Sequence, residues 1–96
     1  AEADPVWRLP LWAPYRKRLD SRIADLNNVS DGPFAGAVTA ALFLQEFVGQ
    51  GIPWAHFDIY AWNPQARPGR PEGGEMQAVR AVFAVIAERF GRRARR

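Results

Sequence analysis

The sequence predicts an α/β fold, in which helices cover a layer of β-sheet, with the elements in the order helix, helix, strand, helix. Three patterns support this prediction. Residues 34–48 are apolar on nearly every side, as in a buried helix, residues 54–62 alternate as in a strand covered on both faces, and residues 75–90 carry one apolar stripe at helical spacing. A strand flanked by helices, with a long loop after the strand, is typical of an α/β layer rather than of a helical bundle.

Length and composition indicate one unit over residues 1–96, either a small domain or part of a larger one. The chain has 96 residues, 48% of them apolar, and four tryptophans, which argues against disorder. Because it has no cysteine, a disulfide framework and a thiolate zinc site are excluded. No secretory signal is visible, and the longest nearly apolar run is shorter than the roughly 20 residues that cross a bilayer. We expect a soluble, cytoplasmic protein with no membrane partner.

The positive charge of the sequence comes from its end. Four arginines stand within the last five residues, and without them the formal net charge of +3 becomes −1. A basic tail can neutralise phosphates of nucleic acid or acidic lipid, but no aromatic residue interleaves with these arginines to stack on bases. We therefore interpret the tail as a solvated helix end, where arginines favour the negative end of the helix dipole, and expect no nucleic-acid partner.

Residues 1–14 are predicted to form an extended arm, because three prolines prevent a continuous helix. The α/β part then covers residues 15–96. Its first helix is predicted over residues 15–26, where apolar side chains recur at gaps of four, four and three and the other face is basic and solvated. A loop over residues 27–33 follows, since this stretch is rich in Asn, Ser, Asp and Gly.

The second helix is predicted over residues 34–48, after Pro33, a residue suited to a helix start. Alanine and glycine keep this helix thin, and its apolar residues lie on every face, so it should be buried on every side. A free chain of 96 residues has hardly enough protein to surround such a helix. We therefore expect it to lie inside a larger structure.

The strand is predicted over residues 54–62, and a central position is favoured over an edge because neither face is wholly polar. One strand makes no sheet, so its partners must come from a longer chain or from another copy. A proline- and glycine-rich loop over residues 63–74 follows. The last helix is predicted over residues 75–90, with Glu75 in the first turn, where the helix dipole favours it, and Gly91 as the C′ residue.

His56 and Asp58 share one face of the predicted strand and are the pair that could act as a base and its orienting partner. Residues i and i+2 of a strand lie about 6.5–7 Å apart, too far for a direct hydrogen bond, and no nucleophile stands nearby. As metal ligands they are two, and a zinc site needs three or four. We interpret both as buried structural residues satisfied by neighbouring groups.

The glycines before the last helix do not make a phosphate-binding loop, because the Gly-Lys-Ser/Thr ending is missing and Glu72 and Glu75 would repel an anion. Arg67 and Arg70 lie just beyond the end of the strand, which is where open α/β sheets bind ligands. The tryptophans and tyrosines are interpreted as core or interface packing rather than as a binding cleft.

Several stretches carry a family resemblance: Val6-Trp-Arg-Leu-Pro-Leu11, Ala24-Asp-Leu-Asn-Asn28, Phe34-Ala-Gly-Ala-Val-Thr-Ala-Ala-Leu-Phe-Leu44 and Trp54-Ala-His-Phe-Asp-Ile-Tyr-Ala-Trp62. In order and spacing they resemble the C-terminal end of the catalytic domain of the cytosolic leucyl aminopeptidases, two-metal exopeptidases that remove N-terminal residues from peptides. The resemblance implies a mixed sheet flanked by helices, a pair of divalent metals, zinc or manganese, and a homohexamer. It also implies two further partners, the remainder of the catalytic domain and a peptide substrate.

By the same resemblance, Tyr60, Ala61 and Asn63 fall where the pocket for the substrate's first side chain is expected. Family members often read Asp-Ile-Ala-Gly where this chain has Asp58-Ile-Tyr-Ala61, so Tyr60 replaces a small residue. A subfamily with a different loop after the strand is implied, in which pocket size and substrate preference stay open.

What the chain lacks shapes the functional expectation. The family's metal-binding lysine and aspartates, and its Asn-Thr-Asp-Ala-Glu-Gly-Arg-like motif with the catalytic arginine, have no counterpart in this sequence. We therefore expect no catalytic residue and no metal ligand here, and no activity of this chain alone. The alternative is a free-standing interaction module, without catalytic activity, that buries its apolar helix by self-association.

Overall fold

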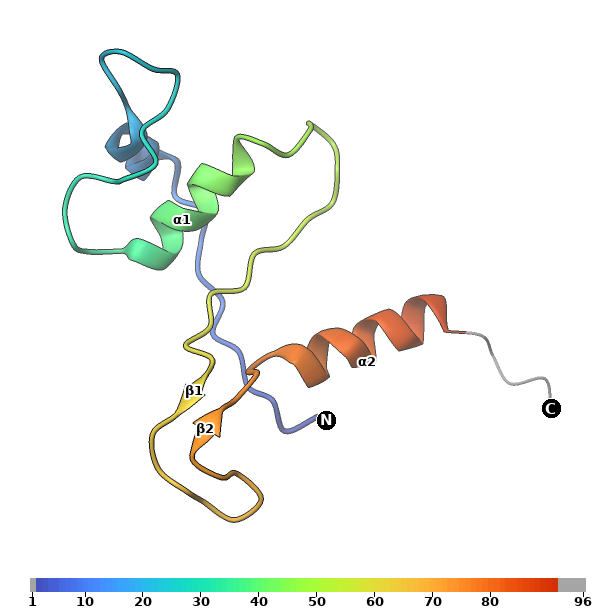
Figure 1. Cartoon of the computed structure of the whole chain (residues 1–96). Helices are drawn as coiled ribbons and strands as arrows, with labels where there is room; N and C mark the ends of the chain where they lie inside the picture. The colour runs from blue at the N-terminus through green and yellow to red at the C-terminus, as the bar shows by residue number, and fades with distance from the viewer. Residues whose placement is uncertain (1, 92–96) are drawn as a thin grey trace. The chain divides into compact units, whose positions relative to one another are not determined.

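We describe the chain in a computed structural model over residues 2–91 (Figure 1). Its elements, in chain order, are the 3-10 helix η1 (Ala13–Leu19), the α-helix α1 (Gly36–Gln45), the short strands β1 (Trp62–Asn63) and β2 (Gly73–Gly74), and the α-helix α2 (Val79–Phe90). They fall into two compact units, one over Arg8–His56 and the other made of the residues up to Trp7 together with those from Phe57 onward. The arginine-rich end, predicted as a solvated helix end, lies outside the described residues.

The unit Arg8–His56 has its core where η1 packs on α1. Leu19 of η1 is only 2% exposed, and Ala41 and Leu42 of α1 are buried. The rim of this contact is polar, since the Arg16 guanidinium pairs with the carboxylates of Glu46 and Asp20. The hydrogen bond with Glu46 is the main cause that raises the pKa of Arg16. Part of the predicted solvated basic face thus holds the two helices of this unit together.

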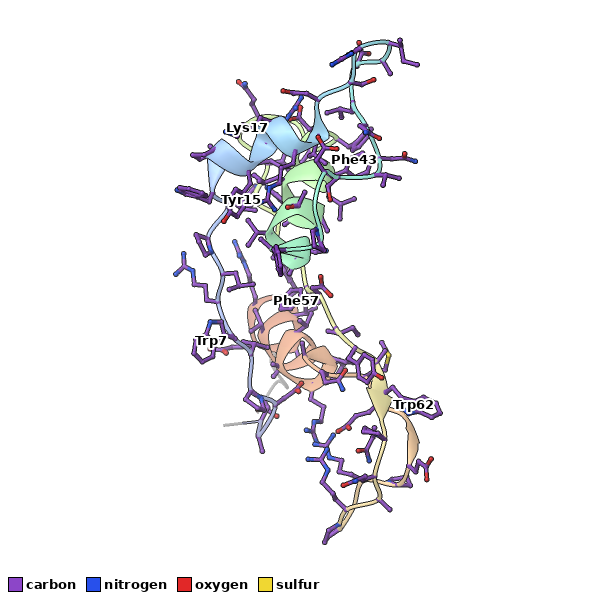
Figure 2. All side chains as sticks on the ribbon, turned by 90° about the vertical axis from the view of Figure 1, so that its left-hand side faces the viewer. Trp7, Tyr15, Lys17, Phe43, Phe57 and Trp62 are labelled. Atoms are coloured by element: carbon purple, nitrogen blue, oxygen red, sulfur yellow. The ribbon has the colours of Figure 1, made fainter. Side chains whose placement is uncertain are left out.

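The prediction of a regular helix over residues 15–26 is wrong in its type and extent. The structure has a 3-10 helix that ends at Leu19, held in part by aromatic contacts near its start (Figure 2). The rings of Trp12 and Tyr15 meet edge to face with centroids 4.6 Å apart. The chain then turns, because the Ser21 hydroxyl accepts the N–H groups of Ile23 and Ala24 and so competes with a helical ladder. Ile23, expected on the apolar face, is 98% exposed.

The second predicted helix is confirmed, with closer limits. Helix α1 begins three residues after Pro33, because Ala35 takes a left-handed conformation with φ of 58° immediately before it. The helix ends at Gln45 and passes into a turn that reaches Val48. Within the chain its apolar surface is covered on one side only, and Leu44 is exposed. Burial on every side by a larger structure stays a prediction.

No strand forms over residues 54–61 of the described chain; the strand residues are Trp62 and Asn63 of β1, which pair antiparallel with Gly74 and Gly73 of β2. The physical reason is the one anticipated from the sequence. An extended segment becomes a strand only when its N–H and C=O groups find a neighbouring strand, and the described residues offer none before Trp62. The α/β class is supported at the level of helices with a small sheet, whereas the mixed sheet is not seen in this chain.

The last predicted helix is confirmed, although α2 begins at Val79 rather than at Glu75. Its apolar stripe faces Phe57 and Ile59, and together they line a cleft of about 350 Å³. Gly91 closes the helix with an extended backbone rather than the left-handed conformation typical of a C′ glycine. Glycine suits this position because a Cβ atom there would lie 2.2 Å from the carbonyl oxygen of Ala87.

The start of α2 is capped by a residue that lies far away in the sequence. The Asp4 carboxylate accepts the N–H of Ala78 at 2.9 Å and that of Ala81 at 3.1 Å, while Arg80 donates to the carbonyl of Ala3 at 3.1 Å. Amides of the first helical turn have no partner inside the helix, and the helix dipole favours an anion there. The hydrogen bonds from Ala81 and Ala78 lower the pKa of Asp4 below its ordinary value of 3.8.

We expect Asp4→Ala to loosen the first turn of α2. At neutral pH the amides of Ala78 and Ala81 should exchange faster with solvent, and the melting temperature should fall, because both acceptors are removed. Since the folded-state pKa of Asp4 is depressed, its stabilisation is complete above pH 3.8 and is lost as the pH falls through the folded-state value. The melting difference from wild type should therefore narrow in acid. Glu2→Ala removes a carboxylate from the same arm and is the control; equal effects of the two variants would contradict the cap.

Candidate functional site

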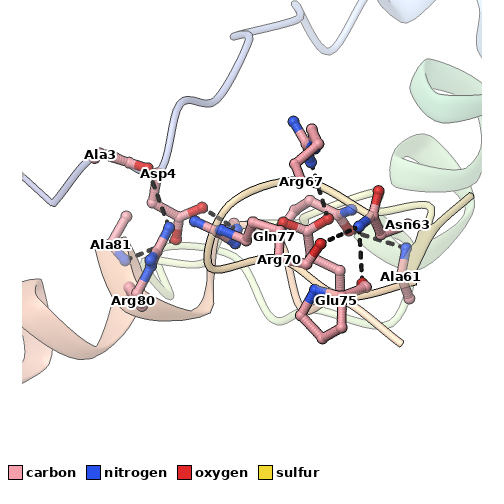
Figure 3. A network of polar contacts seen from close by, with 12 residues as sticks. Ala3, Asp4, Ala61, Asn63, Arg67, Arg70, Glu75, Gln77, Arg80 and Ala81 are labelled. Atoms are coloured by element: carbon pink, nitrogen blue, oxygen red, sulfur yellow. Dashed lines mark hydrogen bonds and ion pairs between the residues drawn. The ribbon is translucent and has the colours of Figure 1, made fainter. Parts of the chain in front are cut away.

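The segment Tyr60–Asn63, singled out by the sequence, enters a hairpin and is held by backbone hydrogen bonds (Figure 3). Ala61 has φ of 60°, a left-handed conformation that side-chain-bearing residues seldom adopt. Its N–H donates to Oε1 of Gln77 at 2.9 Å, and its carbonyl accepts the N–H of Glu75 at 3.0 Å. The residues that lead into α2 thus fix both backbone polar groups of this turn.

Asn63 closes the hairpin from the inside. It is 4% exposed, and its side-chain amide donates to the carbonyls of Arg70 at 3.0 Å and of Pro71 at 2.8 Å. Nearer the tip, Arg67 and Arg70 exchange two backbone hydrogen bonds of 2.8 Å each. The predicted loop over residues 63–74 is therefore an ordered hairpin.

One carboxylate serves the two arginines of this hairpin. Glu75, whose side chain is 14% exposed, accepts from Arg70 Nη1 at 2.5 Å and from Arg67 Nη2 at 3.3 Å. The interpretation of Glu75 as a first-turn residue is wrong, because α2 begins at Val79 and Glu75 is engaged by the hairpin. Arg67 and Arg70 do lie at the loop where a ligand was expected, but Glu75 offsets one of their two charges.

The three predicted pocket residues differ in what they offer. Tyr60 is 77% exposed, so its ring is accessible within this chain. Ala61 is partly buried in its left-handed turn, and the side-chain N–H groups of Asn63 are used within the hairpin. The three are neighbours on one short stretch, in which Tyr60 has the most exposed side chain.

His56 and Asp58 do not behave as predicted. Asp58 is exposed and His56 is only partly buried, so the interpretation of both as buried, satisfied residues is wrong for the chain as described. The reason is the missing sheet, because neighbouring strands would have covered this segment. The two residues belong to different units, and no shared site is assigned to them.

The described residues do not fit a metal centre. Over residues 2–91, no group of three or more His, Cys, Asp or Glu side chains is close enough to hold a metal ion. A pair of divalent metals would therefore need ligands from outside this part of the chain. No helix in the same range is long and apolar enough to cross a membrane.

Comparison with known proteins decides the family. Residues 1–83 match the family model described as the cytosol aminopeptidase family, catalytic domain. The chain belongs to the cytosol aminopeptidase family. This confirms the resemblance drawn from the sequence motifs.

Individual relatives agree with this family assignment. It is 46% identical over 93 residues to a probable cytosol aminopeptidase of Caulobacter vibrioides, covering 94% of this chain and 18% of that protein. A probable cytosol aminopeptidase of Geobacter sulfurreducens is 46% identical over 88 residues, covering 90% and 17%. The crystal structure of a cytosol aminopeptidase from Coxiella burnetii superposes with a TM-score of 0.84 at 61% identity, covering 93% of this chain and 19% of that one. The chain thus spans about a fifth of the length of these relatives.

Two structural features of the candidate site escaped the sequence-based interpretation. Gln77 holds the turn at Ala61, and Glu75 holds the arginines, yet neither residue belongs to a motif. The remote cap by Asp4 likewise has no sequence signal, because a capping side chain is normally sought just before its helix.

Glu75→Gln should weaken the hairpin that joins β1 and β2. Loss of the charge on an acceptor shared by two guanidinium groups should cost about 1 kcal/mol of stability, a modest figure because Arg67 is largely exposed. Urea unfolding at low and high salt measures this, and the loss should shrink as salt screens the pairs. Glu72→Gln makes the same charge change at an exposed site of the same hairpin and should be nearly neutral. Equal losses in both variants would show that Glu75 has no special role.

Proposed function

We propose that this chain works as part of a metal-dependent aminopeptidase that removes N-terminal amino acids from peptides in the cytoplasm. The observation that carries the proposal is the match of residues 1–83 to the catalytic domain of the family. In this proposal the chain contributes core packing and part of the substrate pocket. The two divalent metals, zinc or manganese, are held by residues outside the described range, because residues 2–91 contain no suitable cluster.

The pocket contribution is assigned to Tyr60, Ala61 and Asn63. Tyr60 is exposed and stands near the end of the segment that the sequence predicts as a strand, and ligands of α/β proteins bind beyond strand ends. Ala61 and Asn63 support it, the first through a fixed turn and the second by closing the hairpin. A phenol ring at a position where the family resemblance implies a small residue would narrow the pocket and favour small N-terminal side chains.

The apolar surface of the chain supports partners within the same enzyme. Exposed apolar residues gather on α2, where Phe83 is 71% exposed, and Leu44 of α1 is exposed together with Phe34 and Phe47 on either side of that helix. Large exposed apolar patches mark surfaces that another protein segment covers. We assign this surface to the remainder of the catalytic domain, with a homohexamer as the assembly that the family resemblance implies.

In the aminopeptidase that carries this chain, Tyr60→Ala should enlarge the pocket and favour bulky N-terminal residues. A single methylene in an apolar pocket discriminates by about 1–3 kcal/mol, so loss of a phenol ring should raise the ratio of kcat/KM for phenylalanyl over alanyl substrates by about tenfold or more. Tyr15→Ala removes the same ring from the other unit and should leave the ratio unchanged. An unaltered ratio in Tyr60→Ala, with metal content intact, would remove Tyr60 from the pocket.

A second test addresses the metals and the alternative function. The 96-residue chain by itself should neither bind a pair of zinc or manganese ions in calorimetric titration nor hydrolyse a leucyl amide, because it supplies no cluster of ligands in its described range. Stoichiometric metal binding with turnover would contradict this assignment. A discrete, folded homo-oligomer in light scattering, without metals, would instead favour the self-associating interaction module.

A further inference from the structure

The geometry points to Gln77 as a positioning residue for substrate selectivity, which acts through Ala61 on the side chain of Tyr60. This inference rests on the proposed function, in which Tyr60 lines the pocket. Gln77 lies 16 residues after Ala61, at the other end of the hairpin, and its side chain is partly buried. Its proposed role is to hold a turn, without contact to a metal or to a reacting group.

The turn at Ala61 needs to be held. An alanine with φ of 60° sits in a region that costs energy for a residue with a Cβ atom, so the conformation persists only where its surroundings enforce it. Two hydrogen bonds enforce it here, to the Gln77 side chain at 2.9 Å and from the Glu75 amide at 3.0 Å. The hydrogen bond to Gln77 is partly buried. If Gln77 loses its acceptor oxygen, the N–H of Ala61 is left without a hydrogen-bond partner, which costs stability.

Gln77 is itself held in place. The next residue, Ala78, has φ of 66° and donates its N–H to Asp4, which caps α2. The backbone around Gln77 is therefore fixed by the start of the helix, and its side chain also lines the apolar cleft beside α2. A side chain anchored on a helix start is a firm support for a turn on the neighbouring segment (Figure 3).

The position of Tyr60 depends on the turn at Ala61, because the ring has few packing contacts. Its side chain is 77% exposed, and packing inside this chain does not fix it. The direction in which the ring leaves the backbone is consequently set by the turn at the next residue. When the turn relaxes, the ring loses its fixed place at the pocket and discriminates less against large substrate side chains.

The test uses the whole aminopeptidase and the ratio of kcat/KM for phenylalanyl over alanyl substrates. Gln77→Met keeps the length of the side chain but removes the acceptor, and should raise the ratio about three- to tenfold, the equivalent of one hydrogen bond. Gln77→Glu keeps an acceptor and should retain the wild-type ratio. Gln65→Met makes the matched change at an exposed position of the same hairpin and should have no effect.

A double-mutant cycle separates positioning from a general structural role. In the Tyr60→Ala background, Gln77→Met should cause no further change, since there is no ring left to position. A Gln77→Met variant that lowers kcat/KM for both substrates by the same factor, or one whose effect persists without the ring, overturns the inference. If Gln77→Met does not fold, Gln77→Ala removes the same acceptor, and an unchanged ratio there overturns the inference as well.

The two levels of the proposal fail in different ways. If Tyr60→Ala raises the ratio and Gln77→Met does not, the inference on Gln77 is wrong and the pocket assignment stands. If Tyr60→Ala leaves the ratio unchanged, the pocket assignment is wrong, and the inference falls with it.

Discussion

The N–H and the carbonyl of Ala61 each form one hydrogen bond with the residues just before α2, and much of the hairpin depends on these two bonds. They bring residues 61 and 75–77 together, which in turn lets β1 pair with β2 in register. Residues 75–77 lead directly to Ala78, where Asp4 caps the helix. A sheet with two residues in each strand is only weakly stable alone, so these side-chain and backbone contacts provide stability that the hydrogen bonds between the strands do not.

Charge in this unit is organised around the same hairpin. Glu75 is the acceptor for two guanidinium groups and also donates its own N–H to Ala61, so one residue joins the electrostatics of the tip to the geometry of the turn. Asn63 adds a neutral link across the base of the loop. The candidate pocket therefore rests on a braced hairpin rather than on a free loop, although proline and glycine make up much of its sequence.

Sequence patterns predicted the presence of the helices better than the residues at which each helix begins and ends. Apolar residues on nearly every side identified α1 and an apolar stripe at helical spacing identified α2, but α2 starts four residues later than predicted because Glu75 and Gln77 contact Ala61 instead. Alternation predicted a strand over residues 54–62, but a strand also requires a partner, which no local pattern can supply, and in the described chain the strand is confined to Trp62 and Asn63. The motifs were enough to identify the family, whereas Gln77 and Asp4 escaped notice because their contacts join distant parts of the chain.

Over residues 2–91, the four residues with positive φ that are not glycine, at positions 3, 35, 61 and 78, are all alanines, and the one at position 61 adjoins the proposed pocket. A left-handed backbone accepts glycine, tolerates alanine at some cost, and excludes β-branched side chains. Neighbouring positions 60 and 61 are therefore unequal as sites for altering selectivity. A mutant library that varies residue 60 freely and keeps alanine or glycine at position 61 would sample pocket shapes on an intact hairpin. In a library that varies both positions, most variants would be unable to form the turn.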